Sequence, residues 1–143
     1  MFSGEYEYKI DSKGRVSIPP KLRSQFADGI VLNRGVDNCI DVYPQSTWKE
    51  SVAQLQPLFA TMNEKSRRGK RILFANAFTT ELDEQGRVML PPALRQHANI
   101  QDTLVIAGVN NRLEIWSKES WAAEQALMKE QVWQIFESME PAK

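Results

Sequence analysis

Residues 11–23 of the chain read DSKGRVSIPPKLR, and residues 83–95 repeat the pattern as DEQGRVMLPPALR. The two stretches share an Asp, a Gly, an Arg, a Val, two prolines, a Leu and a final Arg, in the same order and without a gap. A pattern that occurs twice in a short chain indicates that one supersecondary unit has been built twice. We therefore expect two structurally similar halves.

The likeness between the halves extends beyond this pattern. Residues 35–43, GVDNCIDVY, match residues 108–116, GVNNRLEIW, with an offset that is larger by a single residue. One loop therefore carries an insertion, and each half should form four strands that pack with the other half as a pseudo-symmetric pair. The predicted organisation is a first repeat over residues 5–48, a linking helical segment over 49–76, a second repeat over 77–121 and a C-terminal helix over 122–143.

Length and composition limit the kind of protein. The chain has 143 residues, so each half is too small to bury a core of its own, and we expect a shared core. The 18 basic and 18 acidic side chains cancel, whereas non-specific nucleic-acid binders usually carry a large positive excess. The single cysteine, Cys39, excludes an internal disulfide and fits a reducing cytoplasm. Because we find neither an apolar run of roughly 20 residues nor a signal peptide, we expect a cytoplasmic protein without a membrane partner.

The repeated pattern predicts a strand, a tight turn and a second strand. Residues 5–10 alternate between apolar and charged side chains, as a half-buried strand does. Asp11 then opens a turn by accepting hydrogen bonds from the following amides, and Gly14 supplies its left-handed residue. This structural role suits the Asp of each repeat better than a catalytic one. In the second strand the apolar side chains should point inward and Arg15 outward.

Further elements follow from local signals. The two prolines after each repeated strand stop the strand and open a short helix. Residues 30–34 and 40–43 are typical of a β-hairpin, and Thr47 with Glu50 has the spacing of a helix capping box. Ser117 is placed to cap a long terminal helix, whose apolar side chains recur at alternating spacings of four and three. Such a seam suits a partner helix, a core or both.

Arg15 and Arg87 are the strongest candidates for a functional role. Each should lie on the outward face, four residues after an Asp that could hold its side chain in place. A solvated Arg that pairs with such an Asp contributes at most about 1 kcal/mol. Alternatively, a guanidinium held on a hairpin is a rigid fork that matches the edge of guanine and also binds phosphate. Packing gives no reason to keep an outward Arg in both repeats, so the recurrence favours recognition.

Other residues give weaker signals. His97 has no carboxylate or cysteine at metal-ligand spacing, so we expect it to face solvent or to cap the short helix. Cys39 aligns with Arg112, which predicts a face outside the core, and a reactive thiol there would have no base. The basic run over residues 65–71 fits a solvated helix face, with phosphate contact as a second interpretation. These patterns predict neither an enzyme nor a cofactor or metal site.

The doubled Asp-x-x-Gly-Arg-Val-x-[Ile/Leu]-Pro-Pro occurs together with MFSG at residues 1–4, LNRGVDNC at 32–39 and RRGKRILF at 67–74. This combination, which spans essentially the whole chain, resembles the MraZ family. The hairpin alone also resembles the wider group of AbrB-like swapped-hairpin proteins. The resemblance implies an α+β fold that is mainly β: a double-split β-barrel of two pseudo-symmetric AbrB-like halves with flanking helices.

The same resemblance implies a function. MraZ-like proteins are bacterial transcriptional regulators of the division and cell-wall gene cluster, associate with the nucleoid and close into ring-shaped homo-oligomers. Their DNA-contacting motif, Asp-x-x-x-Arg, is intact here from Asp11 to Arg15 and from Asp83 to Arg87. The predicted function is a sequence-specific repressor, acting on its own promoter among others, that binds short G-rich direct repeats in double-stranded DNA. The expected DNA-binding residues are Arg15, Arg87, Lys13, Asp11, Asp83, Gly14 and Gly86.

Two other functions compete with this prediction. The first is a structural oligomer whose repeated hairpins bind protein instead of DNA, and the zero net charge favours it. The paired arginines and the basic run over residues 65–71 favour DNA. An enzyme ranks third, because related barrels can host chemistry but likeness of fold alone says little about activity.

Overall fold

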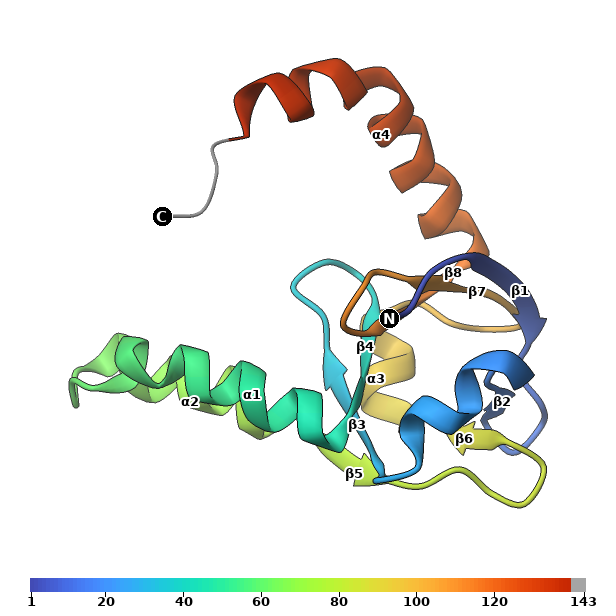
Figure 1. Ribbon diagram of the computed structural model, residues 1–143, viewed down its shortest axis with the longest axis horizontal. Coiled ribbons are helices and arrows are strands. Elements are labelled where there is room, and N and C mark those ends of the chain that lie inside the picture. The colour runs from blue at the N-terminus through green and yellow to red at the C-terminus, as the bar shows by residue number, and fades with distance from the viewer. Residues whose placement is uncertain (140–143) are drawn as a thin grey trace.

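The computed structural model describes residues 1–139 and has a mixed α+β fold built around an antiparallel sheet (Figure 1). The sheet contains six strands in the order β1-β7-β8-β4-β3-β5, while β2 and β6 form a separate two-stranded ribbon. The strands are β1 (Glu5–Lys9), β2 (Arg15–Ser17), β3 (Ile30–Arg34), β4 (Ile40–Pro44), β5 (Phe78–Thr80), β6 (Arg87–Met89), β7 (Thr103–Gly108) and β8 (Leu113–Ser117). The predicted α+β class is confirmed, and closure of the strands into a double-split barrel stays a prediction.

The helices extend beyond the sheet. They are η1 (Pro20–Phe26), α1 (Gln45–Leu55), η2 (Gln56–Phe59), α2 (Glu64–Phe74), α3 (Pro92–His97) and α4 (Lys118–Ser138). α1 and α2 project together as a hairpin, and α4 leaves the end of β8 and arches away from the sheet (Figure 1). The last residues of the predicted C-terminal helix, 140–143, lie outside the described part of the chain. Within residues 1–139, no helix combines the length and apolar character that crossing a membrane requires.

Strands from the two repeats are interleaved. β1 pairs with β7, so that Glu5 lies opposite Ala107, and β3 pairs with β5. β2 pairs with β6, with Val16 opposite Val88 at the centre of the ribbon. Each of these pairs joins an element of the first repeat to an element of the second. The two copies of the sequence pattern therefore complete one common structure.

The repeated turn forms because glycine occupies its last position. Gly14 and Gly86 have φ values of 79° and 76°, which only glycine adopts at little cost. The strands that follow place the apolar side chains of both repeats in one core, which contains Val16, Ile18, Val88 and Leu90. Reciprocal hydrogen bonds, from Ile18 N to Gly86 O (2.9 Å) and from Leu90 N to Gly14 O (2.8 Å), tie each strand to the other turn.

The helix boundaries confirm one predicted cap and contradict another. The Ser117 hydroxyl accepts a hydrogen bond from Ser120 N (3.0 Å) and caps α4, as expected. The predicted capping box at Thr47 is wrong, because α1 begins at Gln45, directly after Pro44, and the Asp28 carboxylate, not Thr47, accepts a hydrogen bond from a first-turn amide, Ser46 N (2.9 Å). Proline already fixes the backbone angle that a helix start needs, and Asp28, in the loop before β3, supplies the polar cap. The short helix predicted after the first pair of prolines is confirmed as η1, which is a 3-10 helix.

Two predictions about single residues are wrong. Cys39 is buried, with 1% of its surface exposed, although its alignment with Arg112 predicts a face outside the core. Burial raises the pKa of the Cys39 thiol, which argues against a reactive thiolate. His97 neither faces solvent freely nor caps its helix, because its Nε2 lies 3.1 Å from Gly35 O and 2.9 Å from Asp37 O. The histidine therefore joins α3 to the β3–β4 loop.

Candidate nucleic-acid interface

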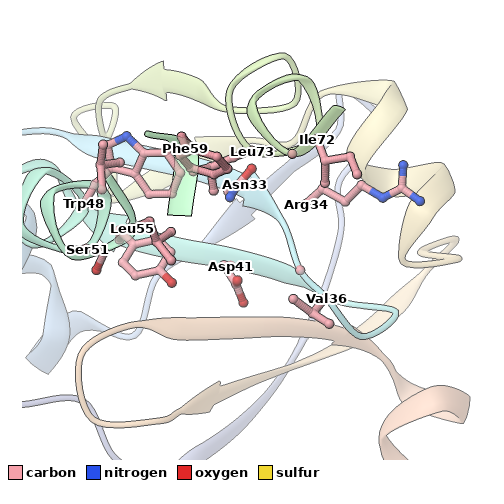
Figure 2. Close-up of a pocket in the computed structure, with 14 residues that line it drawn as sticks. Asn33, Arg34, Val36, Asp41, Trp48, Ser51, Leu55, Phe59, Ile72 and Leu73 are labelled. Carbon is pink, nitrogen blue, oxygen red and sulfur yellow. The ribbon is translucent and has the colours of Figure 1, made fainter. Parts of the chain in front are cut away.

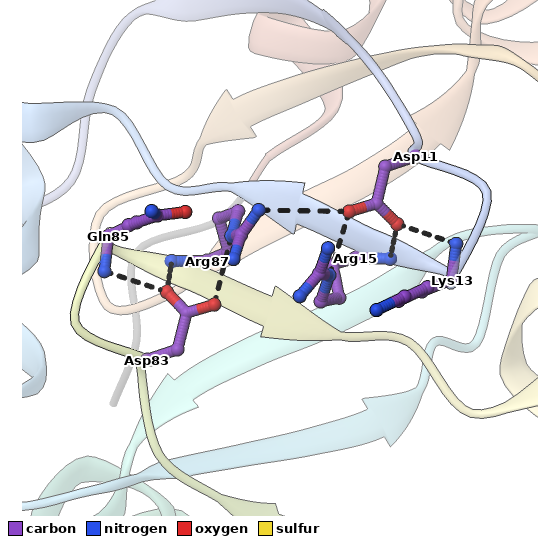
Figure 3. Close-up of polar contacts among 6 residues, drawn as sticks. All are labelled: Asp11, Lys13, Arg15, Asp83, Gln85 and Arg87. Atoms are coloured by element: carbon purple, nitrogen blue, oxygen red, sulfur yellow. Dashed lines mark hydrogen bonds and ion pairs between the residues drawn. The ribbon is translucent and has the colours of Figure 1, made fainter.

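The β2–β6 ribbon brings the two repeated arginines together. Its register places Arg15 opposite Met89 and Ser17 opposite Arg87, so all four side chains alternate with the buried valines. The arginines therefore lie on the face of the ribbon that points away from the core (Figure 3). Each side chain is 27% exposed, so a ligand can reach part of each arginine.

Each arginine is held by the Asp at the start of its own turn. Asp11 Oδ1 accepts hydrogen bonds from the backbone N–H groups of Lys13 (2.9 Å) and Arg15 (2.8 Å), and Asp11 Oδ2 accepts from Arg15 Nε (2.7 Å). The backbone N–H of Arg15, with help from its guanidinium, lowers the pKa of Asp11 to about 2. The carboxylate thus orders the turn and orients the arginine at once.

The second repeat builds the same arrangement. Asp83 accepts hydrogen bonds from Gln85 N, Arg87 N and Arg87 Nε, each at 2.9 Å (Figure 3). The backbone N–H of Arg87 is the main cause of the lowered pKa of Asp83. Because Nε faces the Asp in both repeats, the two Nη groups at the end of each fork are the parts that a ligand would meet.

The two arginine sites also contact each other. Asp11 Oδ2 lies 4.0 Å from Arg87 Nη1, so the carboxylate of the first repeat faces both guanidinium groups. Arg15 and Arg87 line one shallow hollow of about 340 Å³, together with Asp83, Glu84 and Gln85. The sequence predicts each Asp–Arg pair separately, whereas this contact between repeats becomes visible only when β2 and β6 pair.

A second pair of arginines supports the turns. Arg95 lies over Gly14 and Arg23 lies over Gly86, so each turn is covered by the last residue of the pattern in the other repeat. Arg23 Nε donates to Ile18 O (2.8 Å), and the Nε of Arg95 is buried and has no hydrogen-bond partner within the described residues. The sequence-based prediction of site residues does not include these two, although their recurrence at one position in both repeats is a signal for them.

The other predicted residues lie at different distances from this site. The backbone of Lys13 is part of the first turn and its side chain is exposed, which fits a contact at the edge of the ribbon. The basic run over residues 65–71 lies on α2, at the opposite end of the molecule from β2 and β6 in Figure 1. The structure therefore does not bring the basic run together with the ribbon in a single copy of the chain.

A buried polar cluster on β4 and β8 holds the one group of metal-type donors found in the described residues. The donor atoms of Cys39, Asp41 and Glu114 lie within 4.8 Å of one another. Arg112 occupies this cluster, with Nε 3.3 Å from Asp41 Oδ1 and Nη2 3.0 Å from Glu114 Oε2. Burial raises the pKa of Asp41 to about 6, against the attraction of Arg112. Because the guanidinium of Arg112 already supplies the positive charge that a metal ion would bring to these carboxylates, we interpret the cluster as structural.

Comparison with known proteins identifies the family. The family described as "MraZ protein, putative antitoxin-like" matches residues 1–70 and 73–139. A protein of Dehalococcoides mccartyi named "Transcriptional regulator MraZ" is 45% identical over 141 residues, which cover 98% of this chain and 99% of the relative. Relatives of the same name from Herpetosiphon aurantiacus and Natranaerobius thermophilus are 45% and 46% identical over 121 residues, covering 85% of this chain and 84% of each relative. The doubled match follows the two repeats, and the chain belongs to the MraZ family.

Proposed function

We propose that this protein is a transcriptional regulator that binds double-stranded DNA through the outer face of the β2–β6 ribbon. The observation that carries the proposal is the pair of Asp-held arginines, Arg15 and Arg87, brought side by side from two repeats. A two-stranded ribbon fits the major groove, where a guanidinium fork can donate to O6 and N7 of guanine. The relatives' printed name, transcriptional regulator, supports the same function.

The zero net charge of the chain is compatible with this role. Charge-driven binding to phosphate needs an excess of basic residues, but readout of bases needs only a few well-placed donors. Asp11 and Asp83 lower the local positive charge while they fix the direction of the forks. A single copy should therefore bind weakly and with a preference for guanine. Lys13 lies at the edge of the turn, where it could add a phosphate contact.

Weak single contacts favour an assembly of several copies. We propose a ring-shaped homo-oligomer in which the hairpins of neighbouring copies engage short G-rich direct repeats, spaced near one duplex turn of roughly 10 bp. Linking the contacts in this way can raise overall affinity by about 10² or more. On this proposal the interleaved halves form a double-split barrel, and the protein acts in the cytoplasm, at the nucleoid. It represses the division and cell-wall gene cluster, including its own promoter.

The decisive measurement is DNA binding by the variant Arg15→Ala/Arg87→Ala. We expect the variant to fold and to lose specific binding to the chain's own upstream DNA, with a loss of about 1–3 kcal/mol for each guanine contact in each copy. Fluorescence anisotropy over a series of salt concentrations would measure the affinity, and the slope would count the phosphates engaged. Lys49→Ala/Lys118→Ala removes the same charge from exposed positions off the ribbon and should retain specific binding.

The competing function makes the opposite prediction. If the repeated hairpins bind only protein, the arginine variant will bind DNA as the unaltered chain does and will instead lose a protein contact. Unchanged affinity in the double variant would therefore refute the recognition role of Arg15 and Arg87.

A further inference from the structure

The outer half of α4 exposes several large apolar side chains. The first turns of the helix pack on the sheet, where the rings of Trp121 and Trp116 lie 5.7 Å apart. Further along, Trp133 is 78% exposed and Phe136 is 67% exposed. Val132, which is also exposed, lies on the same side of the helix as Phe136, whereas the exposed Met128 and Ile135 lie further round it. The side of the helix that carries Val132, Trp133 and Phe136 is stabilised when a partner covers it.

The α1–α2 hairpin and the β3–β4 hairpin enclose an apolar groove of about 630 Å³ (Figure 2). Its walls come from α1, η2 and α2, and its floor comes from β3 and β4. Aromatic and aliphatic side chains dominate the walls: Trp48, Val52, Leu55, Phe59, Ile72 and Leu73. A groove of this size accepts several large side chains of an amphipathic helix.

The floor of the groove contains an unmet hydrogen-bond acceptor. Asn33 is 5% exposed, and its Oδ1 has no hydrogen-bond partner among residues 1–139. A buried acceptor of this kind is costly unless an incoming group donates to it. Trp133 carries one N–H donor on a large apolar ring, so it matches both the walls and the floor of the groove.

The charges of the two elements are complementary. α2, which forms one wall, carries five Lys or Arg side chains and a single Glu. The outer half of α4, residues 128–138, carries two Glu side chains against one Lys. Opposite potentials on two surfaces speed their encounter and help to fix their orientation.

We propose that residues 128–138 of one copy pack into the α1–α2 groove of a second copy, with Trp133 as the anchor. This inference rests on the proposed assembly of several copies and names the surfaces that join them. The helix and the groove are different patches of one chain, so the contact is heterologous. Each copy then donates one helix and accepts another, which builds a ring when the rotation between copies closes.

Two variants that each keep one of the patches test this arrangement. Trp133→Asp/Phe136→Asp disables the helix, and Val36→Asp/Ile72→Asp disables the groove; all four side chains are exposed, so both variants should fold. Light scattering after size exclusion should show an oligomer for the unaltered chain and a monomer for each variant alone. An equal mixture of the variants should form a dimer and nothing larger, because one intact helix and one intact groove remain.

Controls separate this contact from other associations. Leu58→Asp/Met62→Asp alters exposed apolar residues of the same hairpin that do not line the groove, and it should assemble like the unaltered chain. Assembly that survives the Trp133 and Phe136 substitutions, a mixture that stays monomeric, or an unaltered chain that is itself monomeric would overturn the inference. Arg15→Ala/Arg87→Ala should assemble normally, and the monomeric variants should still bind one site weakly, so failure of the DNA-binding proposal would be distinguishable.

Discussion

Gly14 and Gly86 occupy the same position in the two repeats, but the side chains above them predict different responses to substitution. A Cβ at Gly14 would lie 3.2 Å from Arg95 Cζ, whereas a Cβ at Gly86 would overlap Arg23 Nε. Both substitutions strain a left-handed backbone by about 1–2 kcal/mol. We expect Gly86→Ala to lower the free energy of unfolding more than Gly14→Ala, because Arg23 must also move. Urea denaturation of the two variants would show the order, and equal losses would contradict it.

Asp41 should make stability depend on pH in the opposite direction from an ordinary salt-bridged carboxylate. Its pKa is about 6 in the folded chain, above the model-compound value of 3.8, so the folded state holds a proton that the unfolded state releases. The contribution is present below about pH 4 and is lost as the pH rises to about 6, and it amounts to about 3 kcal/mol. Asp41→Asn removes the titrating group, so its unfolding free energy should fall less over this range. Urea titrations at pH 4 and pH 7 would check this; parallel losses in both proteins would be the contrary result.

Much of the candidate site could be predicted at the scale of single residues. The spacing from Asp11 to Arg15 predicts the turn, its carboxylate cap and the oriented guanidinium, because all these contacts are local. The contact of Asp11 with Arg87 could not be predicted, since it depends on the pairing of strands from distant parts of the chain. The burial of Cys39 could not be predicted for a similar reason. Arg112, the residue aligned with it in the second repeat, does not mark an exposed face, because it contacts the buried polar cluster beside the thiol.

At the scale of the elements, the two helix starts differ in how they are stabilised. Ser117→Ala should remove the cap of α4 and lower the free energy of unfolding by about 1 kcal/mol. Thr47→Ala should change it by much less, because the start of α1 is fixed by Pro44 and capped by the Asp28 carboxylate, which accepts from Ser46 N. Thermal denaturation of both variants would compare them. A larger loss at Thr47 would mean that the predicted capping box exists after all.

Strands with strong local signals could be predicted well, whereas the type of the short helices could not. The β3–β4 hairpin follows from apolar runs on both sides of a polar turn, and the structure has it where the pattern predicts it. The extra turn η2 follows from Pro57, which cannot continue a helix. The 3-10 geometry of η1 has no sequence signal that distinguishes it from an α-helix, because its positions are set by the core side chains Leu22 and Phe26.

At the scale of the whole molecule, the halves are related by sequence but not separable in structure. The core contains side chains of both repeats in one cluster, and no hairpin of either repeat completes it alone. The two projections, the α1–α2 hairpin and α4, lie outside this core (Figure 1). This division leaves the projections free to join copies while the ribbon stays available for DNA, as both proposals require.

The pairing of strands from one repeat with strands from the other also determines when the protein can fold during synthesis. β1 is the first strand to leave the ribosome, yet its partner β7 lies in the second repeat, with Glu5 opposite Ala107. Such distant pairings slow folding and leave strand edges exposed in the growing chain. The first repeat therefore stays incompletely folded while the second is translated. If the protein binds DNA as proposed, this activity should therefore arise only after β7 of the second repeat has been translated.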